Sequence, residues 1–184
     1  LAEGRLKEGR VDWKTLEVDR DTLVIDCTGA AARVGPFSDW QFAISKGEVL
    51  RVATANLQPN LILHRGHWVL PVENEDAWLG ATHEPGIDDV EPTVAARDVL
   101  LATAEKLTGE TFTPTAHLVG QRLASRDMPP VVGRHPDAPN RGILSALGSK
   151  GVLYAPWLAR QWVEHLNAGN DFDPSADIVR GVLY

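Results

Sequence analysis

Residues 142–166 read GILSALGSKGVLYAPWLARQWVEHL, and this stretch decides the fold of the C-terminal part of the chain. A short apolar run stops at a Gly-Ser-Lys-Gly turn and passes directly into a helical pattern, which predicts a strand, a glycine turn and a helix. Glycines let a backbone approach a ligand closely, and the free N–H groups at a helix start attract an electron-rich atom. We therefore expect residues 148–153 to face a phosphate or a ring carbonyl, the alternative being an ordinary strand-to-helix connection.

Two further motifs lie upstream. Residues 120–136 read GQRLASRDMPPVVGRHP, and residues 22–30 read TLVIDCTGA, an apolar run that ends in a Thr-Gly pair. In order and spacing, the three segments resemble the C-terminal half of the FAD-dependent amino-acid and amine oxidoreductases, the family that includes D-amino-acid oxidase and glycine oxidase. The family pattern G-x-R-P-x-[ST]-x-D-x-x-P-x-[IV]-G matches from Gly120 to Gly133, except that Leu123 stands where relatives usually have Pro.

The resemblance implies an α+β fold. An antiparallel substrate-domain sheet with a helix would be flanked by the C-terminal pieces of a Rossmann-like FAD-binding domain. Residues 1–36 would end the FAD-binding domain, residues 37–119 would form the substrate-binding antiparallel β domain, and residues 120–184 would supply the C-terminal FAD-binding segment and the closing helix.

The pattern of residues between the motifs agrees with this organisation. Short β-rich runs separated by turn residues predict antiparallel strands, and a returning strand is expected over residues 113–123. A helix is expected from Glu91 to Leu107, with Pro92 in its first turn and Gly109 just past its end. The β-rich runs are residues 47–52, 61–64, 68–71 and 77–82.

Two side chains are expected to act on the substrate or the reduced flavin. Arg122 stands where relatives hold a substrate carboxylate, a role suited to a planar guanidinium fork, and the alternative is an ion pair with Asp127. Lys150 would face the flavin and hold negative charge on the reduced ring or meet the substrate, and the alternative is a solvated lysine. The resemblance thus makes Arg122 and Lys150 the expected catalytic residues, with His83 lining the substrate cavity beside Arg122.

The expected cofactor is non-covalent FAD, because no cysteine stands near the glycine turn. The turn includes Gly151 as a candidate for a positive φ. The residues expected to contact FAD are Thr28, Gly29, Gly133, Gly148, Ser149, Lys150, Gly151, Val152 and Leu153.

The activity implied is oxidation of the C–N bond of an amino acid or a secondary amine by hydride transfer to the flavin, followed by hydrolysis of the imine. Two alternatives remain. The glycine turn also resembles that of FAD-dependent tRNA-modifying (methylaminomethyl-uridine) oxidoreductases, although a net charge of −7 makes nucleic-acid binding by this segment unexpected. The chain could instead be a non-catalytic fragment without FAD.

The sequence contains no G-x-G-x-x-G, the motif that should open an FAD-binding fold of this kind. We expect the N-terminal FAD-binding half of the same protein to be the partner of this chain, and the chain to be inactive by itself. No apolar run approaches the length of a membrane span. The histidines do not have a recognisable metal-ligand spacing, so no metal is expected.

The single cysteine, Cys27, indicates a reducing compartment, and a cytoplasmic location is expected. We expect Cys27 to be a buried, inert thiol within the apolar strand.

Overall fold

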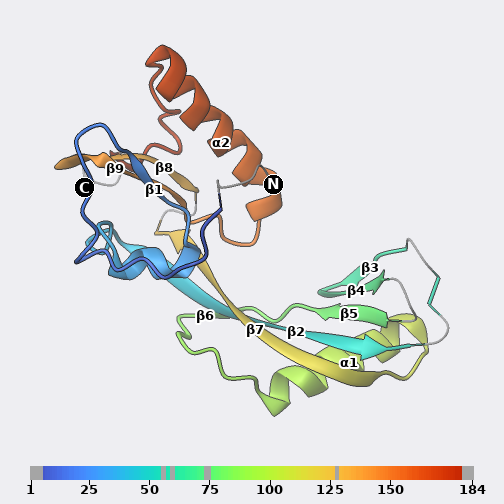
Figure 1. The fold of residues 1–184 in the computed structure, drawn as a ribbon. Helices are drawn as coiled ribbons and strands as arrows, with labels where there is room; N and C mark the ends of the chain where they lie inside the picture. Colours follow the sequence, from blue (N-terminus) through green and yellow to red (C-terminus); the bar gives the residue numbers. More distant parts are fainter. Residues whose placement is uncertain (1–5, 55–56, 59–60, 73–75, 127–128, 180–184) are drawn as a thin grey trace. The chain divides into compact units, whose positions relative to one another are not determined.

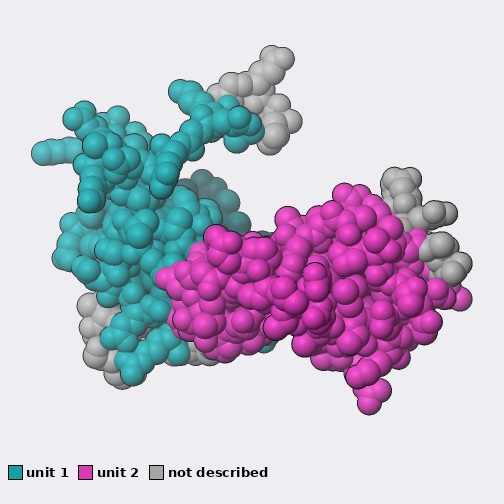
Figure 2. All heavy atoms as spheres, turned by 90° about the horizontal axis from the view of Figure 1, so that it is seen from below, with its two compact units in different colours: residues 1–42, 125–184 teal, residues 43–124 magenta. Residues whose placement is uncertain are grey.

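The computed structural model describes residues 6–54, 57–58, 61–72, 76–126 and 129–179. They form a mixed α+β structure with a largely antiparallel arrangement of strands, which confirms the predicted fold class (Figure 1). The chain divides into two compact units, shown in different colours in Figure 2. Unit 1 comprises residues 1–42 and 125–184, and unit 2 comprises residues 43–124.

Unit 2 is built on a sheet with the strand order β3-β4-β5-β2-β6, and β7 also pairs with β2. Neighbours along that order are antiparallel where their register is defined, as in Leu50 opposite Leu79 and Leu70 opposite Trp78. The predicted strands are therefore present, although β2 begins earlier than expected. The bounds are β2 Phe42–Ala53, β3 Leu63–Arg65, β4 His67–Val72, β5 Asp76–Gly80, β6 Glu84–Pro85 and β7 Thr113–Ser125.

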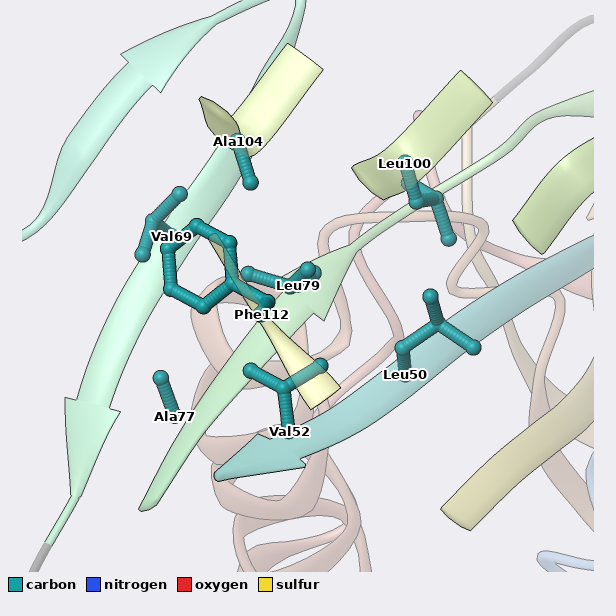
Figure 3. Packing of buried hydrophobic residues seen from close by; sticks show 8 residues of the cluster. All are labelled: Leu50, Val52, Val69, Ala77, Leu79, Leu100, Ala104 and Phe112. Atoms are coloured by element: carbon teal, nitrogen blue, oxygen red, sulfur yellow. The ribbon is translucent and has the colours of Figure 1, made fainter. Parts of the chain in front are cut away.

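The helix of unit 2, α1 (Val94–Thr108), covers one face of this sheet. The hydroxyl of Thr93 accepts a hydrogen bond from the N–H of Ala96, which makes Thr93 the N-cap, and Gly109 ends the helix at φ 76°. Pro92 thus precedes the N-cap. The prediction that placed Pro92 in the first turn is therefore wrong. Apolar residues of β2, β4, β5 and α1, together with Phe112 just before β7, meet in one core, which Figure 3 shows: Leu50, Val52, Val69, Ala77, Leu79, Leu100, Ala104 and Phe112.

Unit 1 contains a three-stranded sheet in the order β1-β9-β8. Strand β1 (Val24–Asp26) is parallel to β9 (Ala138–Ser145), and β8 (Val131–His135) is antiparallel to β9. A short 3-10 helix, η1 (Gly29–Val34), follows β1, and the closing helix α2 (Gly151–Ala168) follows β9. The strand, turn and helix predicted from residues 142–166 are therefore present.

Helix α2 packs on the sheet of unit 1 through Leu158 and Trp162, which meet Val132, Phe172 and Ala176 in a second core. The indole N–H of Trp162 donates to the carbonyl of Ile143 at 3.1 Å. Gly142 makes this packing possible, because a Cβ at that position would lie 2.6 Å from the indole ring. The first glycine of the decisive stretch is therefore explained by the close approach of a tryptophan.

Candidate active site

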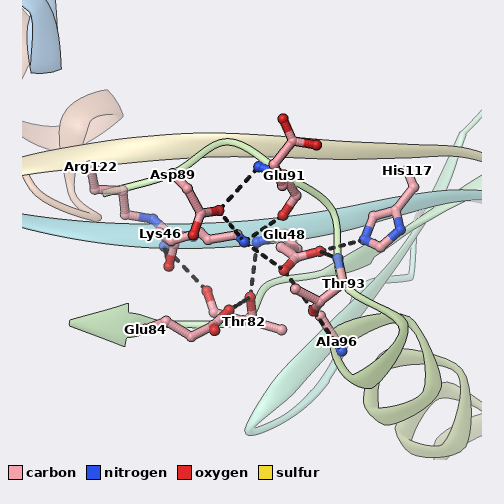
Figure 4. Close-up of polar contacts among 10 residues, drawn as sticks. All are labelled: Lys46, Glu48, Thr82, Glu84, Asp89, Glu91, Thr93, Ala96, His117 and Arg122. Atoms are coloured by element: carbon pink, nitrogen blue, oxygen red, sulfur yellow. Dashed lines mark hydrogen bonds and ion pairs between the residues drawn. The ribbon is translucent and has the colours of Figure 1, made fainter. Parts of the chain in front are cut away.

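The two units each carry one group of the predicted site residues, and each group is described within its own unit. In unit 2, Arg122 is a half-buried residue of β7 (Figure 4). Its Nη1 donates to the carbonyl oxygens of Thr82 at 3.2 Å and of Lys46 at 3.5 Å. Within the described ranges, no carboxylate pairs with Arg122, and Asp127 lies outside those ranges. The guanidinium is thus held by main-chain oxygens, and no carboxylate among the described residues compensates its charge.

A buried polar network lies beside these carbonyl groups. Lys46 and Glu48, two residues apart on β2, are 2% and 0% exposed, and Lys46 Nζ lies 3.6 Å from Glu48 Oε1. Lys46 Nζ also donates to Asp89 Oδ1 at 2.6 Å and to the carbonyl of Glu91. Both oxygens of Glu48 accept hydrogen bonds at 2.9 Å from Thr93, one from its N–H and one from its hydroxyl. Buried charges of both signs are therefore partnered, as burial requires.

The network shifts the ionisation of its members. Burial acts to raise the pKa of Glu48, but the two donors of Thr93 and the charges of Lys46 and His117 outweigh burial and lower it. The hydrogen bond to Asp89 raises the pKa of Lys46, against the opposing effect of desolvation, and the same bond lowers the pKa of Asp89. Glu48, Lys46 and Asp89 are therefore charged at neutral pH.

His117 on β7 approaches Glu48 from the other side, with its Nε2 2.7 Å from Glu48 Oε2. The approach is not aligned as a hydrogen bond, so attraction between them depends on a protonated ring. His83 is exposed and lies between β5 and β6. It follows Thr82 directly, the residue whose carbonyl accepts a hydrogen bond from Arg122.

In unit 1, the predicted cofactor turn connects β9 to α2. Gly148 has φ 56°, and Ala146 has φ 57°, so the chain passes through the left-handed region on its way to the helix. Gly151 lies in the first helical position without a positive φ, which corrects the expectation from sequence. The helix begins there because the carbonyl of Lys150 accepts hydrogen bonds from the N–H groups of Leu153 and Tyr154.

The first turn of α2 leaves the N–H groups of Gly151 and Val152 without a main-chain partner among the described residues. Val152 is 96% exposed, and Ser149 and Lys150 are also exposed. Donors and one cationic side chain are therefore available at this helix start.

Two buried polar atoms near this turn have no hydrogen-bond partner within the described part of the chain, namely Asp26 Oδ2 and Ser145 Oγ. Asp26 is paired in register with Ile143, so Asp26 and Ser145 point to the same face of the sheet. Both residues end parallel strands, the place where α/β sheets bind ligands. Unsatisfied buried atoms of this kind call for a partner, and a polar cofactor fits that requirement.

Other predicted cofactor residues have structural roles that follow from contacts within unit 1. The N–H and hydroxyl of Thr28 donate to Asp26 Oδ1 at 2.9 and 2.7 Å, and Gly29 begins η1 at φ 64°. Gly133 has φ 140°, and a Cβ there would lie 2.8 Å from Ile178 Cγ2. The backbone conformation and the packing against Ile178 thus require glycine at position 133, with or without a ligand nearby.

Cys27 is exposed, so the expectation of a buried thiol was wrong: β1 ends at Asp26, one residue earlier than the apolar run suggests. Local desolvation and the charge of Asp26 raise the pKa of the Cys27 thiol, which makes it a weak nucleophile at neutral pH. In the ranges that the structure describes, no three His, Cys, Asp or Glu residues gather as a metal site. None of the described helices is long and apolar enough to cross a membrane.

Comparison with known proteins gives a consistent picture. The family model described as FAD dependent oxidoreductase matches residues 3–165. Glycine oxidase from Geobacillus kaustophilus is similar at 25% identity and a TM-score of 0.68, over 84% of this chain and 44% of that chain. Iminodiacetate oxidase from Chelativorans sp. BNC1 has a TM-score of 0.71 at 19% identity, over 82% of this chain and 43% of that chain. The chain therefore spans less than half the length of these solved structures.

The buried network of Lys46, Glu48 and Thr93 was not predicted from the sequence. One signal was available: Lys46 and Glu48 alternate along a strand, so their side chains share a face with the apolar Leu50 and Val52. The partners come from the segment before α1 and from β7, and no local pattern links these to β2.

Proposed function

Because this chain belongs to the FAD-dependent oxidoreductases, we propose that it is part of an enzyme that oxidises the C–N bond of an amino acid or a secondary amine. The observation that carries the proposal is the state of Arg122. Its guanidinium is fixed by the carbonyl oxygens of Lys46 and Thr82, and no described carboxylate neutralises it. A half-buried guanidinium prepared in this way is suited to a substrate carboxylate.

The names of the similar structures support this substrate class. Glycine and iminodiacetate, the compounds in the names of two similar oxidases, both combine an amine with carboxylate groups. In the proposed enzyme, Arg122 orients the substrate through its carboxylate, and His83 lines the cavity nearby. Holding the amine-bearing carbon in one orientation is a large part of what a protein contributes to such a reaction.

FAD, when bound, accepts the hydride that leaves the carbon bearing the amine. The residues proposed to hold it are the Thr28-Gly29 pair, Gly133 and the turn from Gly148 to Leu153, with the free N–H groups of Gly151 and Val152 as donors. Lys150 adds a positive charge at this turn. We propose non-covalent binding, since the only cysteine of the sequence, Cys27, is not part of the turn from Gly148 to Leu153.

Two experiments test the proposal. The absorbance spectrum of this chain alone, mixed with FAD, should show weak binding or none, because the sequence has no G-x-G-x-x-G to hold the pyrophosphate. Reconstitution with the N-terminal FAD-binding half should restore flavin binding and amine-oxidising activity. Tight, stoichiometric flavin on the isolated chain would contradict the assignment of a shared site.

The second experiment replaces Arg122 in the complete protein. Arg122→Lys keeps the charge and removes the planar fork, so kcat/KM for carboxylate-bearing amines should fall. The expected loss of transition-state stabilisation is about 1.5–3 kcal/mol. Arg97→Lys, on the exposed face of α1, is the matched control and should change nothing. If Arg122→Lys retains full efficiency on each carboxylate-bearing amine that the protein accepts, Arg122 is structural and the proposal fails.

A further inference from the structure

Gly47 on β2 lies against the guanidinium of Arg122. A Cβ built at Gly47 would be 2.1 Å from Nη1, 2.4 Å from Nη2 and 2.5 Å from Cζ of Arg122. These separations are far shorter than any van der Waals contact, so no side chain at position 47 is compatible with this position of Arg122. The absence of a side chain on β2 is what allows the guanidinium to lie across the strand.

The orientation of the guanidinium follows from its two anchors. Nη1 donates to the carbonyl groups of Lys46 and Thr82, whereas Nε and Nη2 have no partner in the described part of the chain. The Nε–Nη2 edge is one of the faces on which a guanidinium binds a carboxylate through two parallel hydrogen bonds. The edge that is not anchored is thus suited to bidentate recognition.

We propose that Gly47 is a specificity-determining position: by lacking a side chain, it lets Arg122 lie on β2 with Nη1 anchored and the Nε–Nη2 edge turned to the substrate's carboxylate. This inference rests on the proposed function, since it concerns how the same arginine meets the same class of substrate. Gly47 acts through Arg122 and is therefore a positioning residue.

The anchors themselves are held firmly. The N–H of Thr82 donates to the carbonyl of Glu48 at 3.1 Å, and the N–H of Glu48 donates to the hydroxyl of Thr82 at 2.9 Å. These two bonds fix Thr82 against β2. When a methyl group is added at Gly47, the strand and its anchors stay in place and the flexible end of Arg122 moves, because the atoms that clash belong to that end.

Gly47→Ala in the complete, flavin-loaded protein tests the inference, with Gly120→Ala as the matched control. Gly120 lies two residues before Arg122 on β7, and nothing lies within 4 Å of a Cβ there. Kinetics are measured on an amino acid and on its primary amide, the amide being followed as a substrate or as a competitive inhibitor. FAD content is measured by absorbance for every variant.

Gly47→Ala should lower kcat/KM for the amino acid by about tenfold or more, because it removes charge-assisted hydrogen bonds that bind and orient the substrate. Binding of the amide should change by less than about twofold, since the amide has no carboxylate to lose. Gly120→Ala should match the unsubstituted protein, and FAD content should be equal in all. A crystal structure of the Gly47→Ala variant should show that Nη1 has left the carbonyl of Thr82.

Three outcomes overturn the inference and are distinguishable. If Arg122→Lys lowers efficiency on the amino acid and Gly47→Ala behaves as Gly120→Ala does, the role of Gly47 is wrong and the proposed function stands. If neither Arg122→Lys nor Gly47→Ala affects the amino acid, carboxylate binding by Arg122 fails, and the inference fails with it. Equal losses for the amino acid and the amide would identify Gly47 as a packing residue and also overturn it.

Discussion

Units 1 and 2 differ in whether the buried polar groups near their candidate sites have hydrogen-bond partners. In unit 2, Lys46 and Glu48 are charged and almost fully buried, yet every oxygen of Glu48 and the ammonium of Lys46 have partners within the same unit. In unit 1, Asp26 Oδ2 and Ser145 Oγ are buried and have no partner among the described residues. Unit 2 also contains two unpartnered buried atoms, Thr54 Oγ1 and His117 Nε2, but the charges of Lys46 and Glu48 are paired. The unpartnered Asp26 Oδ2 and Ser145 Oγ of unit 1 lie at the ends of parallel strands, which suits them to a polar ligand.

The sheets of the two units also differ, in their number of strands and in strand direction. The sheet of unit 2 contains six strands, five of them along its main order of pairing and the sixth, β7, paired with β2. The sheet of unit 1 has three strands, and its edge strand β1 is parallel to β9. Parallel strands are usually found in sheets with further neighbours and covered faces, so this edge is suited to an additional strand.

The largest expected effect tests the buried network around Glu48 in unit 2. Glu48→Ala leaves the ammonium of Lys46 and the donors of Thr93 without their buried partner, and should lower the free energy of unfolding by about 4 kcal/mol. Chemical denaturation measures the change in the free energy of unfolding, and hydrogen exchange in β2 and α1 measures the local loss of stability. Glu105→Ala, on the exposed side of α1, is the control. Equal stability of the two variants would show that the network contributes nothing to unit 2.

A smaller loss is expected from the core of unit 1. Leu158→Ala removes a fully buried side chain from the contact between α2 and the sheet, and should cost about 3 kcal/mol of unfolding free energy. Val163→Ala, at a 55% exposed position of the same helix, should cost far less. A loss no greater than that of the control would mean that α2 does not depend on this core.

The pH dependence of unit 2 should follow Glu48. Its pKa is lowered in the folded protein, so its contribution is present above the unfolded-state pKa, near 4.5, and is lost as the pH falls through the folded pKa. Asp89, whose pKa is also lowered, changes in the same direction. Denaturant titrations between pH 6 and 3 should therefore show unit 2 losing stability towards acid. Glu48→Gln should flatten that dependence, and an unchanged slope would refute the assignment to Glu48.

The smallest effect concerns the turn of unit 1. Gly148→Ala places a side chain at φ 56°, which should cost about 1 kcal/mol, whereas Gly151→Ala sits at a helical φ with ordinary contacts to Leu147 and should be neutral. In the complete protein, FAD occupancy should fall for Gly148→Ala and remain for Gly151→Ala. Thermal unfolding and flavin absorbance together measure this. The reverse order of the two variants would place the critical glycine at the helix start.

Local signals predicted the elements that have local causes. Helix α1 could be located from Pro92 and Gly109, since helix ends depend on neighbouring residues in the chain, although the capping hydroxyl of Thr93 set the first residue. Strand β8 was not predicted, because the Gly-Arg-His-Pro stretch after Val132 is typical of a turn, and its pairing with β9 overrides that preference.

The candidate site could be predicted only where a motif marks it. Arg122 is a candidate because of the spacing of its motif, but its anchors at Lys46 and Thr82 come from segments far away in sequence. The fit of Gly47 beneath the guanidinium is a property of two strands brought together, and neither strand alone indicates it.

The pairing of β1 with β9 also has a consequence for biosynthesis. Unit 2 is one continuous segment, residues 43–124, and two of its strand pairs, β3 with β4 and β4 with β5, join neighbours that emerge from the ribosome in quick succession. Strand β1 leaves first and has its partner only after residues 138–145 have been made. We expect unit 2 to collapse early while β1 stays exposed, so slow translation through residues 125–145 would lengthen the period in which that segment is open to chaperones or to misfolding.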